Sequence, residues 1–113
     1  MTFDEFEAGA WRTFAGQDDA PREQLLAAAL GLAGEVGEFV DLVKKACYHG
    51  HRLDISHATL ELGDVLYSLA VASRVLGTTL EEVAIENQAK LQARYPDGFS
   101  VARSHHREKG AFA

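Results

Sequence analysis

Two stretches decide the fold of this chain: GLAGEVGEFVDLV at residues 31–43 and HATLELGDVLYSL at residues 57–69. Each stretch carries two acidic residues that are three positions apart: Glu35 with Glu38, and Glu61 with Asp64. Residues three apart lie on one face of an α-helix, so each stretch presents two carboxylates side by side if it is helical. Two such pairs on neighbouring helices point to a shared cation.

The polar segment between the two stretches predicts a helical hairpin with its centre near Gly50. Counting outward at about 1.5 Å per residue brings Glu38 level with Glu61, and Glu35 level with Asp64. Four carboxylates held together at neutral pH repel one another, which raises their pKa values. Hard divalent ions such as Mg2+, with Mn2+ as a substitute, relieve that repulsion by binding several carboxylate oxygens. We therefore expect these four acids to form a metal site.

A single acidic pair at this spacing is usually a solvated helix face, so the surroundings of the pairs matter. Apolar residues flank both of them, among them Val36 and Phe39 in the first stretch and Val65 in the second. Surface acids are commoner in polar company, which favours the metal site. Asp41 can join as an outer ligand, but we expect it to pair with Lys44 or Lys45 in solvent.

Three glycines interrupt the first stretch, at positions 31, 34 and 37. Glycine in a helix interior costs about 1 kcal/mol relative to alanine. Gly31 and Gly34 share a face with Glu35 and Glu38, by the spacing i, i+3, i+4, i+7. Two interpretations remain open: a cleared surface that admits a ligand, or a close approach by another helix.

Composition sets the class of protein. At 113 residues the chain is expected to be one domain, spanning 1–113, with long amphipathic helices that leave an apolar face for a partner subunit. A net charge of -6 and a pI of about 5.3 argue against binding to a nucleic-acid polymer. The single cysteine, Cys47, excludes an internal disulfide and fits a reducing compartment. With an acidic N-terminus and no apolar run long enough for a bilayer, a cytoplasmic protein with no membrane contact is expected.

Capping signals divide the chain into four helices and give no indication of strands. Thr2 with Glu5 predicts the start of a first helix, and Pro21 the start of a second that runs to about Cys47. Asp54 or Ser56 caps a third helix, which is apolar almost all round and therefore expected to be buried on several sides. Its expected stop is Gly77. A capping box of Thr79 with Glu82 predicts a fourth helix ending before Pro96, and from Asp97 onward the pattern is lost.

The fourth helix supplies the opposite charge. Asn87, Lys90 and Arg94 share one of its faces. Lysine and arginine together can hold phosphate oxygens, the first as a compact charge and the second as a planar fork. The alternative is that these cations only complement the dipole at the helix C-terminus. Lys44 and Lys45 are further candidates for reaching a phosphate.

Three motifs, in this order, resemble the MazG-type nucleoside triphosphate pyrophosphohydrolases. They are LAGEVGE at 32–38, ELGDVL at 61–66, and Asn87 followed by KLQARYP at 90–96. The resemblance covers about residues 21–99, with 100–113 as a tail that is either disordered or closes over a site. It implies an all-α fold, a four-helix antiparallel bundle-type protomer that assembles into an oligomeric helical bundle, as a homodimer or homotetramer.

The resemblance also implies an activity: Mg2+-dependent cleavage between the α and β phosphates of a nucleoside triphosphate, giving the monophosphate and pyrophosphate, with housecleaning of aberrant nucleotides as a further role. Glu35, Glu38, Glu61 and Asp64 would hold the ions, and Asn87, Lys90, Arg94 and Lys45 would bind the substrate. Some members carry a doubled glutamate where this chain has Gly34 before Glu35. The general base therefore stays open between Glu35 and Glu38.

Three alternatives share parts of this pattern. A phosphoribosyl-ATP pyrophosphohydrolase has a similar set of acids, and a non-catalytic helical interaction module would use Mg2+ only for stability. A di-iron bundle needs Glu-x-x-His repeats, which neither Glu35 nor Glu61 begins.

Four aromatic residues can stack on a nucleobase, although aromatic residues on helices are more often part of the core: Trp11, Phe14, Tyr48 and Tyr67. His49 and His51 are expected to be loop residues.

Overall fold

The computed structural model describes residues 1–106 and is all-α, as the sequence predicts. Its helices are α1 (Phe3–Arg12), α2 (Pro21–Tyr48), α3 (Ile55–Val75), α4 (Leu80–Arg94) and α5 (Val101–His105), and no strand occurs among the described residues. No helix in residues 1–106 is both long and apolar enough to cross a bilayer. The chain divides into two compact units, Met1–Leu80 and the part that begins at Glu81.

The first two helices begin where the capping signals predict. The Thr2 hydroxyl accepts a hydrogen bond from the Glu5 amide at 3.1 Å and caps α1. Pro21 is the first residue of α2, where its missing N–H has no helical partner to lose. α2 continues to Tyr48, one residue beyond the predicted end.

Local chemistry also sets both ends of α3. The Asp54 carboxylate accepts hydrogen bonds from the amides of Ser56 and His57, so Asp54 is the cap and Ser56 is not. At the other end Gly77 takes a φ of +79°, a left-handed conformation in which residues with a Cβ are strained. The predicted stop at Gly77 is confirmed.

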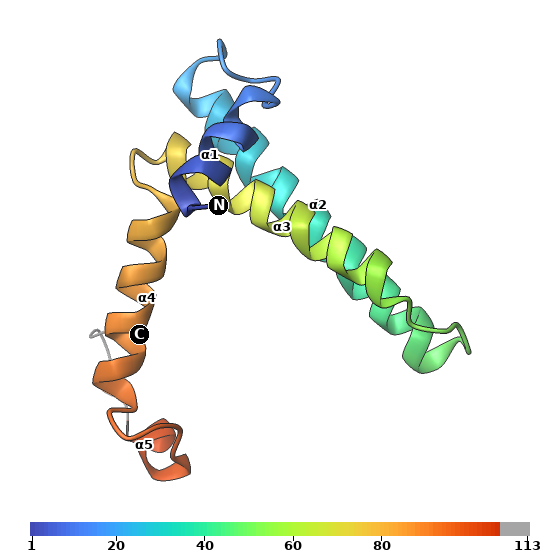
Figure 1. Ribbon diagram of the computed structural model, residues 1–113, viewed down its shortest axis with the longest axis vertical. Helices are drawn as coiled ribbons and strands as arrows, with labels where there is room; N and C mark the ends of the chain where they lie inside the picture. Colours follow the sequence, from blue (N-terminus) through green and yellow to red (C-terminus); the bar gives the residue numbers. More distant parts are fainter. Residues whose placement is uncertain (107–113) are drawn as a thin grey trace. The chain divides into compact units, whose positions relative to one another are not determined.

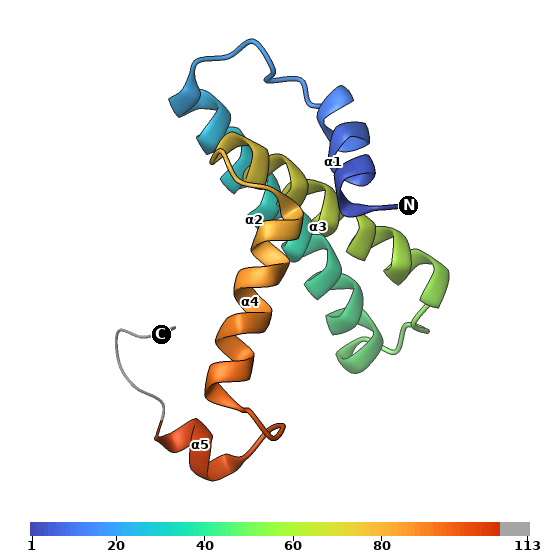
Figure 2. The ribbon, with the colours of Figure 1, turned by 60° about the vertical axis from the view of Figure 1, so that its left-hand side comes forward.

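In the first unit α2 and α3 run antiparallel and side by side, and α1 packs against α3 (Figures 1 and 2). The turn of this hairpin contains Gly50, with a φ of +71°. The buried residues are mostly small: Ala10, Gly16, Ala28, Ser68, Ala70, Val71, Ser73 and Leu80. The Leu80 amide donates to a carboxylate oxygen of Glu7 at 3.0 Å, which ties the start of α4 to α1.

The prediction that α3 is buried on several sides is wrong for the single chain. Leu60 is 70% exposed, Leu62 51% and Leu76 66%. The buried residues of α3 lie between Ser68 and Ser73, because α1 and α2 together cover only part of its surface. A helix apolar all round therefore keeps large side chains in solvent.

The second unit contains most of α4 and all of α5. α4 ends at Arg94, before Pro96, as predicted. No sequence pattern predicted α5, because its five residues are too few for a hydrophobic period. Its cap is local: the Ser100 hydroxyl accepts from the Arg103 amide at 3.2 Å. Within the tail 100–113, Arg107 and the residues after it lie outside the described part of the chain.

Candidate metal centre

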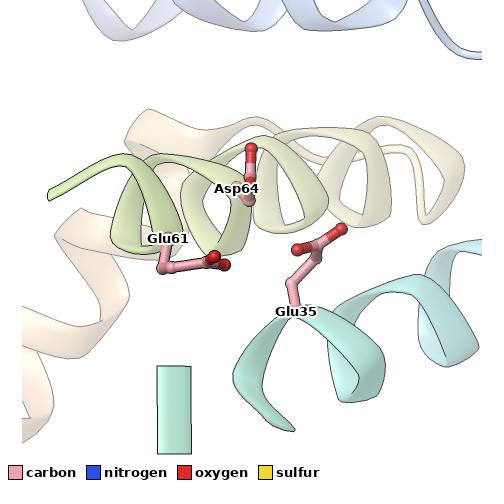
Figure 3. A group of neighbouring side chains, drawn as sticks. All are labelled: Glu35, Glu61 and Asp64. Atoms are coloured by element: carbon pink, nitrogen blue, oxygen red, sulfur yellow. The ribbon is translucent and has the colours of Figure 1, made fainter. Parts of the chain in front are cut away.

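The hairpin brings three of the four predicted acids together. One carboxylate oxygen each from Glu35, Glu61 and Asp64 lies within 4.8 Å of the other two. Figure 3 shows Glu35 and Glu61 directed toward each other from α2 and α3, while Asp64 rises from α3 on the side where α1 passes. All three donors are carboxylate oxygens, the ligands that hard divalent cations prefer.

The surroundings of this acidic group disfavour its full negative charge. Glu35 and Glu61 are half-buried, and Asp64 is exposed. Partial burial raises the pKa of Glu35, and the charges of Asp64, Glu61 and Glu38 raise it further. The predicted rise in pKa is thus found at Glu35. A cation placed among them would remove this cost.

Glu38, the fourth predicted ligand, is outside the group of three. It lies one turn further along α2 and is exposed, although its charge reaches both Glu35 and Lys45. Residues three apart on a helix differ by about 60° around its axis. Glu38 is therefore offset from Glu35 around the axis of α2 as well as along it, and its carboxylate is not among the three that converge.

One neighbour of the acidic group was missed by the sequence reasoning. His57 Nε2 lies 3.1 Å from Oε1 of Glu61, one turn along α3. The imidazole is half-exposed, whereas the Glu61 side chain retains only 15% of its exposure. Its i, i+4 spacing was visible in the sequence, and the contact fixes the orientation of one acid of the group.

Asp41 forms ion pairs and stays outside the acidic group, as predicted. Its carboxylate oxygens lie 2.8 Å from Nζ of Lys45 and 3.3 Å from Nζ of Lys44. Hydrogen bonds from Lys45 and then Lys44 lower the pKa of Asp41, and the Asp41 partner raises the pKa of Lys45. Lys45, a predicted substrate ligand, is therefore held on α2 by a neighbour one turn away.

The glycines of α2 are not needed for packing within the first unit, Met1–Leu80. A Cβ built on Gly34 or Gly37 meets no atom within 4 Å, and one on Gly31 meets only the Ser68 hydroxyl at 3.9 Å, an ordinary contact. Within this part of the chain no helix approaches closely at these positions. The surface beside Glu35 is open.

The predicted phosphate ligands lie on α4, in the second unit. Asn87 is exposed, and Lys90 and Arg94 are half-buried. The Arg94 guanidinium carbon lies 6.0 Å from the centre of the Tyr95 ring, within range of a cation–π contact.

The aromatic candidates for base stacking have different surroundings. The rings of Trp11 and Phe14 lie 5.1 Å apart, and the Arg74 guanidinium carbon lies 4.9 Å from the Trp11 ring centre. These contacts already occupy both rings. Tyr48 is 82% exposed at the end of the hairpin, and Tyr67 is partly buried against the core.

Carboxylates on two facing helices of an all-α chain define a class of helical proteins suited to binding divalent cations. The model of the MazG nucleotide pyrophosphohydrolase domain matches residues 23–99, which is most of the chain and includes every motif quoted above. The chain belongs to this family, whose activity is nucleotide pyrophosphohydrolysis. Comparisons with curated proteins and with solved structures gave no match.

Proposed function

We propose that this protein is a Mg2+-dependent nucleoside triphosphate pyrophosphohydrolase, which cleaves the bond between the α and β phosphates to release the monophosphate and pyrophosphate. The observation that carries the proposal is the convergence of Glu35, Glu61 and Asp64 across the α2–α3 hairpin. Family membership supplies the substrate class, a nucleotide. Mn2+ would substitute for Mg2+, because both accept carboxylate oxygens.

The three converging acids fit a hard cation in donor chemistry and in spacing. We assign them as ligands, with Glu38 as a fourth at the exposed edge. When bound, Mg2+ would neutralise triphosphate charge and lower the pKa of a water molecule. This is the chemistry that a phosphoanhydride bond requires.

The chain's own residues would then move the proton and hold the substrate. The water oxygen forms a new bond to phosphorus, the bridging P–O bond breaks, and a carboxylate takes the water's proton. Glu35 is our first candidate for that base, because its carboxylate lies in the converging group of three acids, and Glu38, one turn further along α2, is the second. We assign Asn87, Lys90 and Arg94, with Lys45, to the phosphate oxygens and to the charge on the departing pyrophosphate.

The test is product analysis with a panel of canonical and damaged nucleoside triphosphates and phosphoribosyl-ATP, with Mg2+, with Mn2+ and with a chelator. Monophosphate and pyrophosphate from a nucleoside triphosphate would support the proposal. Turnover of phosphoribosyl-ATP alone would favour the related pyrophosphohydrolase. If no nucleotide of the panel yields a product while Mg2+ still raises the melting temperature, the protein is a non-catalytic helical module.

Asp64→Ala tests the metal ligands directly. We expect a loss of turnover greater than about 100-fold, because removing even an indirect partner of a metal ligand costs about 10- to 100-fold. Circular dichroism should show helix content unchanged, since Asp64 is exposed. Glu23→Ala is the matched control, an exposed acid in the first turn of α2 that lies outside the group. Full activity in Asp64→Ala would refute the assignment.

We also propose that the protein works as a homodimer or homotetramer in the cytoplasm, where its role would be the removal of aberrant nucleotides. Large apolar side chains on both helices of the hairpin support the assembly, with Leu30 and Leu60 each 70% exposed and Val40 55%. Helices that expose this much apolar surface gain by covering it with a second copy. Sedimentation equilibrium would show a dimer or tetramer, and a monomer at micromolar concentration would contradict this.

A further inference from the structure

A pocket of about 310 Å³ lies between α1 and α3 in the first unit. The residues that line it and matter here are Phe6, Gly9, Ala10, Thr13, Gly63 and Tyr67. Nothing in the proposed cleavage step uses it. Its volume is at the lower end of the roughly 300 to 1,000 Å³ typical of ligand sites, enough for one ring system but not for a whole nucleotide.

Two glycines keep this pocket open, one on each helix. A Cβ built on Gly9 or on Gly63 meets no atom within 4 Å, so neither glycine is required by a close approach of the helices. Each nevertheless costs about 1 kcal/mol relative to alanine in a helix. Both line the pocket, where a side chain would occupy the free space.

The chemistry of the lining suits a flat ring with a polar edge. Phe6 and Tyr67 are partly buried aromatic residues packed around the small core. The Thr13 hydroxyl donates to the Ala10 carbonyl at 3.0 Å and lies 3.4 Å from the Tyr67 hydroxyl. Aromatic side chains offer stacking surface to any base, and hydroxyl groups offer both donors and acceptors to its edge.

The pocket adjoins the acidic group through α3. Gly63 directly precedes Asp64, and Tyr67 follows Asp64 by three residues, which places it on the same side of the helix and about 4.5 Å further along the axis. Figure 3 shows the Asp64 side chain rising on the α1 side of α3. A ligand held at Asp64 thus lies beside the part of α3 that lines the pocket.

We propose that this pocket receives the base of the nucleoside triphosphate whose phosphates lie at Glu35, Glu61 and Asp64. The inference rests on the proposed function and adds to it the position of base recognition. The pocket would set base preference through α1 and through positions 63 and 67, separately from the acids that act on the phosphates.

Gly9→Leu tests this proposal, because it fills the pocket from α1 without touching the acidic group. Stacking of one base is worth about 1 to 3 kcal/mol, so we expect the KM for nucleoside triphosphates to rise about tenfold or more. Inorganic tripolyphosphate has no base, and its inhibition constant should change by less than about twofold, well under the tenfold that 1.4 kcal/mol represents. Ala8→Leu places the same side chain on the adjacent, exposed position outside the pocket and should change neither value.

Binding measured by calorimetry with Mg2+ separates this proposal from the cleavage reaction. If the protein cleaves no nucleotide, loss of nucleotide binding with tripolyphosphate binding retained in Gly9→Leu would still support the base pocket. An unchanged KM and nucleotide affinity in a folded Gly9→Leu protein would overturn it. A change in subunit number that affects the binding of nucleotide and of tripolyphosphate equally would also overturn the proposal. The pocket would then be part of the contact with a second copy of the chain. Leucine is a better helix former than glycine, so the melting temperature should not fall.

Discussion

Replacing Gly34 by alanine should raise the free energy of unfolding by about 1 kcal/mol, the difference between these two residues in a helix interior. The structure supports the full value, because a Cβ at Gly34 meets no atom within 4 Å. With an unfolding entropy of about 2.1 cal/mol/K per residue, this is a rise of about 4 °C in Tm for a chain of 113 residues. Thermal unfolding by circular dichroism at a fixed protein concentration would measure it.

Gly77→Ala is the contrasting control for that measurement. At a φ of +79° alanine is strained by about 1 to 2 kcal/mol, so this variant should melt below the wild type. If Gly34→Ala also melts lower, the glycine accommodates a close neighbour from outside Met1–Leu80, such as a partner subunit, and the argument for an open surface beside Glu35 fails.

Gly34→Leu tests whether the open surface beside Glu35 binds the nucleotide. Leucine also favours the helix, but it covers the surface beside Glu35 where a nucleotide would lie. We expect the KM for nucleoside triphosphates to rise while Tm stays close to that of the wild type. A fall in Tm without a change in KM would identify Gly34 as a packing position.

Two further predictions concern the acids. Because the pKa of Glu35 is raised above its usual 4.5, the folded protein binds this proton more tightly than the unfolded chain, so the chelator-treated protein loses stability as pH rises through the folded-state pKa. Without metal, Glu35→Gln should therefore have a higher melting temperature than the wild type at neutral pH, and this difference should vanish below pH 4.5. The variant should also lose the stabilisation by Mg2+. A difference in melting temperature that does not depend on pH would contradict the prediction. His57→Ala removes the 3.1 Å contact with Glu61 and should weaken Mg2+ affinity about tenfold. Its stability should fall by no more than about 0.5 kcal/mol, as for other exposed i, i+4 pairs, and an unchanged Mg2+ titration would show that the contact is incidental.

The helix ends could be predicted because each depends on a few neighbouring residues. Thr2 and Asp54 accept their predicted backbone hydrogen bonds, and Gly77 takes the left-handed conformation that a stop requires. α5 escaped prediction because five residues contain no period, although Ser100 has the same capping role as Thr2.

The acidic group could be predicted only in part. Counting residues from Gly50 gives the position of each acid along the hairpin, but not the direction of its side chain around the helix axis. Position along the hairpin alone predicted that all four acids meet. The structure brings Glu35, Glu61 and Asp64 to one oxygen cluster and leaves Glu38 outside it, although Glu38 is spaced from Glu35 as Asp64 is from Glu61. Burial was less predictable still: Leu60 is apolar, but α1 and α2 leave it 70% exposed.

The pocket between α1 and α3 depends on how these two helices pack. Its only trace in the sequence is a glycine in each helix, Gly9 and Gly63, that no helix signal requires. Once α3 is seen as a helix, the stretch ELGDVLY at 61–67 contributes to both features. At about 100° per residue, the mean direction of Glu61 and Asp64 differs by about 110° from that of Gly63 and Tyr67. Glu61 and Asp64 accordingly meet Glu35 of α2, while Gly63 and Tyr67 line the pocket beside α1. Asp64 and Tyr67 are the neighbouring edges of the two pairs, about 60° apart. A change at Gly63 or Tyr67 should thus alter the choice of base and leave cation affinity intact, whereas a change at Glu61 should do the reverse.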